Sequence, residues 1–238
     1  MKQSVFIFAT LFLSVFFQSC LFIGPSVKGN GNVVEETRKA GPFEKISVSR
    51  GMNVYITQGE SHRIVVKADE NLLDAIETKI EDNTLKITTS ENIRQSTSKK
   101  VYVTIPGISE IKSAAGSNVY SENTLETKAL VIGTSSGSNM KLQVEAGELS
   151  VSSSSGSNVR LEGTAETFTG KASSGANIKA EDLRVTHCNA TTSSGANLWI
   201  SVGETFEGKA SSGGNIYYSG NPKTVNLESS SGGNLIKK

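Results

Sequence analysis

Few side chains in this sequence could carry out acid–base, nucleophilic or metal chemistry, and they are scattered along the chain. The only two histidines, His62 and His187, lie in different halves of the 238 residues. Cys188 shares the sequence with a single other cysteine, Cys20, so no CxxC-type zinc or redox motif is possible. We therefore predict no catalytic residue, no metal site and no cofactor, and we expect Cys188 to behave as a small buried apolar residue.

Carboxylates could still supply the paired acids of a β-helical polysaccharide lyase or hydrolase. When the second half of the chain is aligned on its repeated glycines, described below, the acids scatter over many offsets and form no column. They are Glu145, Glu162, Glu166, Glu181, Asp182, Glu204, Glu207 and Glu228. A calcium-binding repeat needs an Asp after the glycines, and none recurs. The sequence therefore disfavours an enzyme.

One column of aromatic and basic side chains is typical of a binding surface. It stands four residues after each repeated glycine, between two inward positions, so we expect it to point to solvent. Its members, named the ridge below, are Tyr120, Lys141, Arg160, Lys179, Trp199, Tyr217 and Ile236. Such a ridge can bind a glycan, an anionic polymer or another protein. The alternative is that the aromatics only favour strands and the basic residues keep the sheet soluble.

The repeat that positions this column is a four-residue pattern of glycine, a small residue, asparagine and an apolar residue. It recurs seven times, with glycine-to-glycine spacings of 21, 19, 19, 20, 18 and 19 residues, and residues 51–54 look like an isolated earlier copy. A period near 20 residues indicates a solenoid, and apolar residues at every second position on both sides of the glycine indicate short strands. We predict an all-β, single-stranded parallel β-helix, or β-solenoid, of about seven 19-residue coils.

The asparagines of the repeat are expected to stack in a structural ladder. They are Asn118, Asn139, Asn158, Asn177, Asn197, Asn215 and Asn234. Neighbouring coils would place them about 4.8 Å apart, so that their amides hydrogen-bond along the column. An amide buried without such a partner would cost on the order of 1–3 kcal/mol. The glycine and the asparagine should form the turn, because both tolerate positive φ.

The apolar columns also predict how the core is filled. Gly170 and Gly208 stand where other repeats carry a larger residue, and Phe168 and Phe206 lie two positions earlier in the same repeats. We therefore expect the two phenylalanines to occupy the space that the glycines leave.

Composition narrows the remaining possibilities. The net charge of +1 gives no electrostatic case for binding nucleic acid. Hydrophobic residues make up 36% and aromatic residues 6%, with 23 glycines, so a large globular core of Leu and Phe is excluded. The strict repeat favours regular β-structure over disorder.

The N-terminus is typical of an export signal. Residues 5–17 form an apolar stretch of 13, too short for a bilayer, which needs about 20. Cys20 follows after Gln18 and Ser19, which resembles the bacterial lipoprotein signal, although Phe17 stands where the strict form has Leu. We predict a signal peptide over residues 1–19, lipidation of Cys20 and attachment to the membrane through the acyl chains. The alternative is ordinary cleavage beside a chance cysteine.

The rest of the chain is divided by composition. Residues 20–32 should form a linker, and residues 33–238 the β-helical domain, with an N-terminal β part over residues 33–112 and the repeat array over residues 113–238. Alternating patterns predict strands in the N-terminal part. The helical spacing of apolar residues over residues 70–80 leaves a short helix or a turn open. Residues 91–100 are polar, and we expect a loop there.

The Gly-x-Asn-apolar turn after a pair of serines, together with the lipoprotein-like start, resembles the head GIN domain family. Its name assigns this family to auto-transporter adhesins, and it is common in Bacteroidetes-type bacteria. The resemblance covers about residues 43–235, and residues 46–54, 71–73 and 82–87 are similar to the early part of the family's domain. It implies a β-helical fold at the cell envelope and carries over no catalytic or metal-binding residue.

The leading hypothesis is a non-enzymatic envelope lipoprotein with an adhesive or structural role. Its repetitive face would contact a glycan, an envelope protein or a neighbouring cell. A β-helical carbohydrate-binding or polysaccharide-degrading protein is one alternative, and a scaffold subunit that assembles end to end into an oligomer is another. Residues 21–24 contain no acidic run resembling a surface-export signal, which favours the periplasmic face of the outer membrane.

Overall fold

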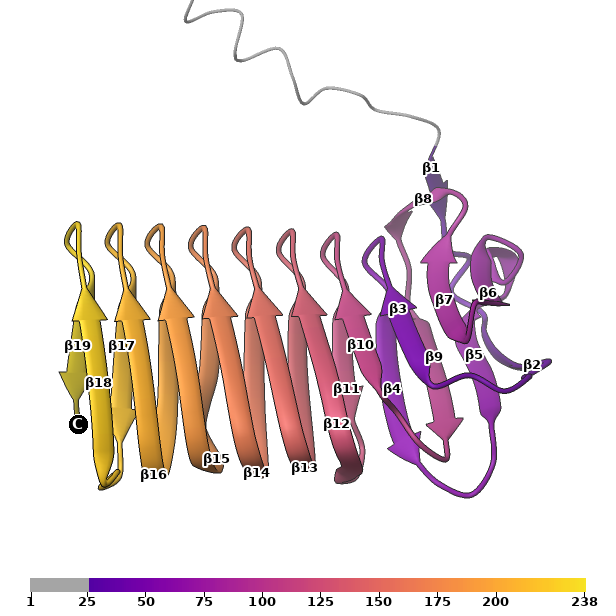
Figure 1. The fold of residues 1–238 in the computed structure, drawn as a ribbon. Helices are drawn as coiled ribbons and strands as arrows, with labels where there is room; N and C mark the ends of the chain where they lie inside the picture. Colours follow the sequence, from indigo (N-terminus) through magenta and orange to yellow (C-terminus); the bar gives the residue numbers. More distant parts are fainter. Residues whose placement is uncertain (1–25) are drawn as a thin grey trace, which may run out of the picture.

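The computed structural model describes residues 26–238, so the predicted signal peptide and Cys20 lie outside the described residues. The predicted fold class is confirmed, because the described chain is a parallel β-solenoid with strands in stacked coils (Figure 1). The strands of the array are β10 (Glu110–Ser113), β11 (Asn118–Ser121), β12 (Leu125–Thr134), β13 (Asn139–Ser153), β14 (Asn158–Ala172), β15 (Asn177–Thr192), β16 (Asn197–Ala210), β17 (Asn215–Ser219), β18 (Thr224–Ser229) and β19 (Asn234–Lys237). Within residues 26–238, no helix is both long and apolar enough to cross a membrane.

Each full coil is one long strand that bends halfway and ends in a tight turn. Strands β13 to β16 are 14 to 16 residues long, where the sequence indicated at least two short strands in each repeat. Neighbouring coils pair in parallel, with asparagine opposite asparagine from one coil to the next. In Figure 1 the turns form one row along the top of the solenoid and the bends form another along the bottom.

The tight turns are of type I′, which fixes the role of the repeated glycine. In the turn from Ser135 to Ser138, the φ values are 52° at Ser136 and 69° at Gly137, and the Ser138 N–H donates to the Ser135 carbonyl over 3.2 Å. A type I′ turn needs positive φ at both central residues. The prediction that the asparagine has positive φ is therefore wrong. The residue before the glycine has it, because the asparagine comes one place after the turn and begins the next strand.

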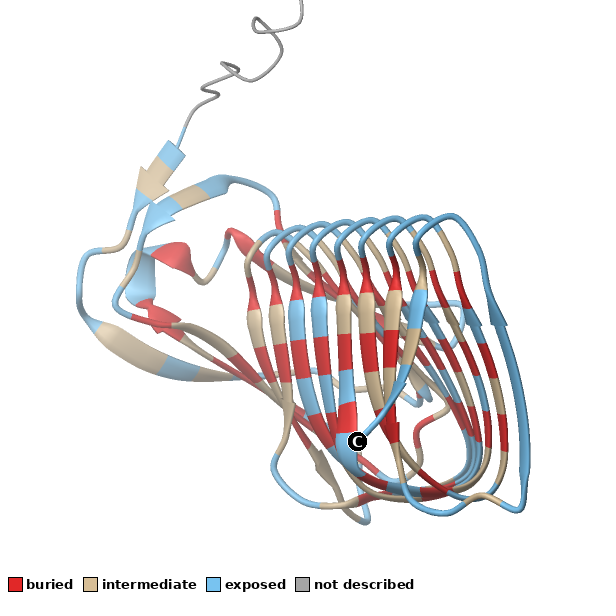
Figure 2. Cartoon of the chain, turned by 90° about the vertical axis from the view of Figure 1, so that its left-hand side faces the viewer, coloured by how far each residue is buried: buried red, intermediate tan, exposed pale blue. Residues whose placement is uncertain are grey.

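The core consists of inward columns that continue from coil to coil. Figure 2 shows the buried residues as bands that cross the stacked strands at the same level. Phe168, Cys188 and Phe206 follow one another in such a column and are buried. A Cβ on Gly170 would lie 2.5 Å from Phe168 Cε1, and one on Gly208 would lie 2.8 Å from Phe206 Cζ. The predicted filling of the glycine positions by phenylalanine is confirmed.

The N-terminal part contributes one further coil and a cap. Its strands are β2 (Val33–Arg38), β3 (Lys45–Val48), β4 (Asn53–Gln58), β5 (Arg63–Asp69), β6 (Ile76–Glu81), β7 (Thr84–Thr89) and β9 (Lys99–Ile105). Strands β3 and β4 flank the earlier copy of the repeat and pair in parallel with β10 and β11. The copy at residues 51–54 is thus a coil of the same stack. Antiparallel pairs β2–β5, β5–β9 and β6–β7 cover its outer side.

The cap contains features that the sequence pattern did not resolve. The apolar spacing over residues 70–80 produces only a 3-10 turn, η2 (Glu70–Leu72), followed by β6. Strand β8 (Asn92–Gln95) lies within the expected polar loop and pairs with β1 (Ser26–Lys28) from the expected linker. Both strands lie beside the row of turns (Figures 1 and 2).

A buried carboxylate, Asp69, joins three segments of the cap. It accepts backbone N–H bonds from Gly31 over 3.2 Å, Thr97 over 3.1 Å and Ser98 over 2.9 Å. Burial raises the pKa of Asp69, but these backbone donors outweigh the burial, so the pKa lies below its ordinary value. Asp69 therefore stays charged and holds the start of the body against the loop before β9.

Candidate functional site

Three surface columns are candidates for function, and the asparagine column is the most regular. Each asparagine donates from Nδ2 to Oδ1 of the preceding asparagine, over 2.8 to 3.0 Å, through all seven repeats. The column begins one coil earlier than predicted, at Asn53, which accepts from Asn118. The side chains are half-buried or exposed. The burial penalty considered above therefore does not apply, and the ladder contributes through its hydrogen bonds alone.

The ridge runs beside this ladder, two residues further along each strand. Trp199 and Tyr217 stack with ring centroids 5.2 Å apart and an interplanar angle of 8°. At the other end, Tyr55 stacks on both Tyr120 and Tyr102, with centroid distances of 5.2 and 5.1 Å. Tyr55 and Tyr102 were not predicted as part of the ridge, although the earlier copy of the repeat places Tyr55 four residues after Gly51.

Three lysine ammonium groups lie close to the rings of these stacks. The ammonium group of Lys179 lies 5.9 Å from the ring centroid of Trp199, and that of Lys238 lies 5.4 Å from Tyr217. Lys100 lies 5.6 Å from the Tyr55 ring. Because the rings stack along the solenoid axis, their faces point at neighbouring coils and mainly their edges are left for a ligand.

The basic centre of the ridge is paired with acids of the adjacent column. Arg160 contacts Glu162 over 3.2 Å and Asp182 over 2.7 Å, and Lys141 contacts Glu162 over 3.3 Å. The hydrogen bonds with these acids raise the pKa of Arg160 above its ordinary value. The hydrogen bond from Lys141 is the main reason that the pKa of Glu162 is lowered. Two of the three central cations of the ridge are thus already neutralised within the chain.

The third surface is a groove along the row of bends, which we name the bend groove. It has a volume of about 1120 Å³ and crosses six successive coils, from β12 to the segment after β17. Its floor is small and apolar, formed by Ala146, Ala165, Val185 and Val202, which are buried and stand in register on β13 to β16. These residues belong to the hydrophobic core, so the groove lies over them, between the outward residues on either side.

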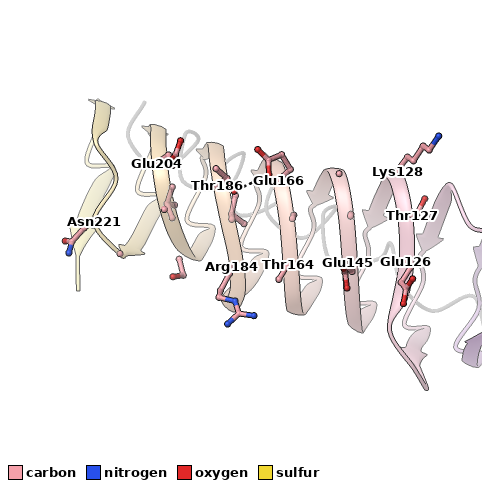
Figure 3. A pocket seen from close by; sticks show the side chains of 18 residues that line it. Glu126, Thr127, Lys128, Glu145, Thr164, Glu166, Arg184, Thr186, Glu204 and Asn221 are labelled. Atoms are coloured by element: carbon pink, nitrogen blue, oxygen red, sulfur yellow. Dashed lines mark hydrogen bonds between the residues drawn. The ribbon is translucent and has the colours of Figure 1, made fainter.

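Two polar walls flank the floor (Figure 3). One carries Glu126, Glu145, Thr164, Arg184 and Ser201, and the other carries Lys128, Glu166, Thr186 and Glu204. Glu204 pairs with Lys223 over 3.1 Å, and Glu166 accepts a bond from Thr186 over 3.4 Å. Among residues 26–238, Glu145 and Arg184 have no ion-pair partner. Unlike the ridge, the bend groove therefore keeps charged groups available for another molecule.

The wall corrects one prediction about the acids. The sequence indicated that carboxylates form no column, but Glu126 and Glu145 pair in register on adjacent coils. Their offsets from the preceding glycine differ because the first coil has two additional residues before the bend. Alignment on the following glycine places both at the same offset. The groove itself was missed for the same reason, since the insertions lie in the bends.

The residues first considered for chemistry lie in separate environments. The Cys188 thiol is free and buried, and burial raises its pKa to about 12. His187 Nδ1 contacts Thr205 Oγ1 over 2.9 Å, whereas His62 Nε2 contacts the Phe43 backbone. In the part of the chain that the structure describes, no three His, Cys, Asp or Glu side chains gather in a way that could hold a metal ion.

Known structures share this fold over nearly its whole length. A "putative adhesin" from Bacteroides fragilis has 24% identity and a TM-score of 0.83, over 89% of this chain and 100% of that one. A "putative adhesin" from Parabacteroides merdae has 21% identity and a TM-score of 0.74, over 90% and 100%. A "putative lipid binding protein" from Parabacteroides distasonis has 18% identity and a TM-score of 0.71, over 90% and 100%. At these identities the likeness concerns the fold alone.

A search of curated proteins finds no match. The family model "Putative auto-transporter adhesin, head GIN domain" matches residues 42–222. This range contains the additional coil at residues 51–54, six of the seven later repeats and both walls of the bend groove. Because it covers more than half of the chain, the protein belongs to the head GIN domain family, as the resemblance of its repeats predicted.

Proposed function

We propose that this protein is a non-enzymatic, lipid-anchored adhesin of the outer membrane, and that the bend groove holds its partner. The observation that carries the proposal is the groove itself, which is continuous over six coils and carries charged groups, such as Glu145 and Arg184, that have no ion-pair partner among residues 26–238. Its shape fits an extended polymer better than a compact small molecule, because it is long, shallow and open along one edge of the solenoid. Its volume is also somewhat above the usual range for small-molecule pockets.

The position of the tether supports this role. Strand β1 begins at Ser26, six residues after Cys20, and six residues extend over at most about 20 Å. β1 lies beside the row of turns, and the bends form the opposite edge (Figures 1 and 2). A chain anchored at Cys20 would keep its turns near the membrane and direct the bend groove away from it.

The arrangement of the groove carboxylates favours binding over catalysis. Glycoside hydrolysis uses two carboxylates on either side of the scissile bond, in environments that separate their pKa values. On one wall of the groove, Glu166 contacts His187 over 3.7 Å and Glu204 contacts Lys223 over 3.1 Å. Glu126 and Glu145, which have no ion-pair partner among residues 26–238, stand together on the other wall, in adjacent coils, and both are exposed. They share one environment, so neither is set apart as the acid or the base.

Protease treatment of intact cells tests the location and the anchor. We expect the wild-type chain to sediment with the outer membrane and a Cys20→Ala variant to be released in soluble form. Digestion in intact cells would place the groove outside the cell, as an adhesin requires. Protection until the outer membrane is broken would rule out direct adhesion.

A filled groove tests the binding site. Thr164→Arg places a long side chain on one wall, whereas Ser150→Arg adds the same side chain to an exposed position of β13 away from the groove. We expect Thr164→Arg alone to reduce binding of the purified protein to envelope material. Equal binding by the two variants would remove the bend groove as the contact surface.

End-to-end assembly is a second candidate function, and the last coil favours it. Val225 and Leu227 belong to inward columns but are 44% and 42% exposed in β18. Size-exclusion chromatography with light scattering would test this candidate. We expect oligomers that dissociate in a Leu227→Glu variant, and a monomer at high concentration would contradict assembly.

A further inference from the structure

We propose that the bend groove binds a linear glycan with about one sugar against each coil, and that it selects neutral or amine-bearing sugars over acidic ones. This inference deepens the proposed function and depends on the groove being the binding site. It names the ligand class from the spacing, the charges and the floor of the groove. None of the ridge residues takes part in it.

The spacing of the walls is the first argument. Coils stack about 4.8 Å apart, so six coils give a row of sites about 24 Å long. A pyranose in an extended chain advances by nearly the same distance as one coil, so successive sugars would meet successive coils in the same way. The walls offer a hydroxyl or a carboxylate on each of the five strands from β12 to β16, with Thr164, Thr186 and Ser201 among the hydroxyls, and the sixth coil offers the amide of Asn221. These groups pair well with sugar hydroxyls.

The charges are the second argument, and they decide which sugars fit. The groove is lined by four carboxylates and two cations, so its net charge is −2. Glu126 and Glu145 stand in register and have no ion-pair partner among the described residues. Carboxylates accept strong hydrogen bonds from hydroxyl and ammonium groups. A uronic acid placed against them would meet like charge, and the two cations of the lining, Lys128 and Arg184, are outnumbered by its four carboxylates.

The floor and the strand pairing disfavour a peptide ligand. A peptide that adds to a sheet needs an open strand edge, and peptide recognition elsewhere needs pockets for its side chains. Strands β13, β14 and β15 pair with neighbours on both sides where they cross the groove. The floor is level, with Ala146 and Ala165 in adjacent coils, and offers no deep apolar pocket. A flat floor suits the faces of sugar rings.

Titration calorimetry with three defined oligosaccharides tests the inference. The probes are glucosamine hexamers, cellohexaose and galacturonic acid hexamers, each compared with its dimer. We expect the glucosamine hexamer to bind best, cellohexaose to bind more weakly and the galacturonate hexamer not to bind. The glucosamine dimer and cellobiose should each bind at least about tenfold more weakly than the matching hexamer, because a dimer spans only two coils.

A charge variant assigns the selectivity to the wall. In Glu145→Gln we expect binding of the glucosamine hexamer to weaken by roughly tenfold, since one charge-assisted hydrogen bond is lost. Binding of cellohexaose should change much less. Glu148→Gln is the matched control, because Glu148 is an exposed carboxylate of the same strand outside the groove.

The outcomes separate this inference from the proposed function. Tight galacturonate binding, or dimers that bind as well as hexamers, would overturn the glycan assignment. If no oligosaccharide binds while Thr164→Arg still reduces binding to envelope material, the groove remains the site and the ligand class is wrong. If Thr164→Arg changes nothing in either assay, both proposals fail.

Discussion

The ridge and the bend groove lie on the same strands, only a few residues apart, yet they differ in how many of their polar groups are paired within the chain. In the ridge, each aromatic face described above meets a ring or a cation, and Arg160 is paired with two carboxylates. In the bend groove, charged residues such as Glu145 and Arg184 lack an ion-pair partner among residues 26–238. Both surfaces repeat with the same period, but among residues 26–238 the groove keeps more charged groups without an ion-pair partner.

The difference teaches that a regular surface column is not by itself a binding site. Stacking identical positions about 4.8 Å apart brings like side chains into contact. The rings of an aromatic column therefore stack on one another, and the amides of an asparagine column hydrogen-bond to one another. We propose that the ridge and the asparagine ladder are mainly structural. The groove side chains do not form such mutual contacts, because the coils differ in length at the bends and the floor residues are small. Substitutions should therefore separate the two surfaces, with ridge variants changing stability and groove variants changing binding.

The largest effect should come from the glycine that fixes the shape of the groove. Gly163 has a φ of 116°, and a Cβ there would lie 2.1 Å from the Val144 carbonyl oxygen of the preceding coil. We expect Gly163→Ala to lower the free energy of unfolding by on the order of 3 kcal/mol, because strain and a backbone clash combine. Urea unfolding followed by circular dichroism measures it.

A turn glycine provides the control for this substitution. Gly137 also has positive φ, at 69°, but a Cβ there would meet no atom within 4 Å. Gly137→Ala should cost only about 1–2 kcal/mol, from conformational strain alone. If both variants lost the same free energy of unfolding, the contact between coils at the bend would not be what fixes the shape of the groove.

The repeat array was predictable because its physics is repeated. Seven copies of one turn average out local exceptions, so the coil length, the inward columns and the pairing of asparagines all follow from a single alignment. Even the glycine–phenylalanine compensation at Gly170 and Phe168 is a local matter of volume within one coil. The turn was assigned to the glycine and the asparagine because serine is not a residue expected at positive φ. In the structure Ser136 has positive φ, and the asparagine does not.

The cap and the groove were not predictable for complementary reasons. The cap depends on single long-range contacts, such as the hydrogen bonds from Gly31, Thr97 and Ser98 to Asp69, which leave no periodic trace in the sequence. The groove depends on register across the bends, where coils of different length shift against one another. An alignment anchored on the preceding glycine loses this register at the bend, whereas one anchored on the following glycine keeps it from Glu126 to Arg184.

An intermediate effect is expected in the ridge. Trp199→Ser removes the stack on Tyr217 and the contact with Lys179, which should cost about 1–2 kcal/mol of stability. Binding of oligosaccharides or envelope material should stay unchanged, since the side chain lies outside the groove. Thermal unfolding and the binding assay are run on the same sample. Lost binding in a variant that still folds would make the ridge a contact surface.

A smaller effect should appear in the acid dependence of the ridge. Glu162 has a lowered pKa in the folded chain, chiefly through its hydrogen bond with Lys141. Its stabilising contribution is therefore complete above the unfolded pKa and is lost as the pH falls through the lowered folded value. We expect Glu162→Gln to be slightly less stable than wild type at pH 7 and equal to it at pH 2.5. A difference that persists at pH 2.5 would mean that packing, and not charge, is responsible.

The smallest effect, an expected absence of reaction, checks that groove variants remain folded. Burial raises the pKa of the Cys188 thiol to about 12, so the thiol stays protonated and covered at pH 8. In a Cys20→Ala background, a thiol reagent should leave Cys188 unmodified in the native chain and modify it fully in denaturant. Thr164→Arg should give the same protection, because the substituted residue is on the surface. Rapid modification of Cys188 in the Thr164→Arg variant would show that this variant loses binding because a coil has opened, and not because the groove is filled. The contrast between the two surfaces would then rest on Glu145→Gln alone.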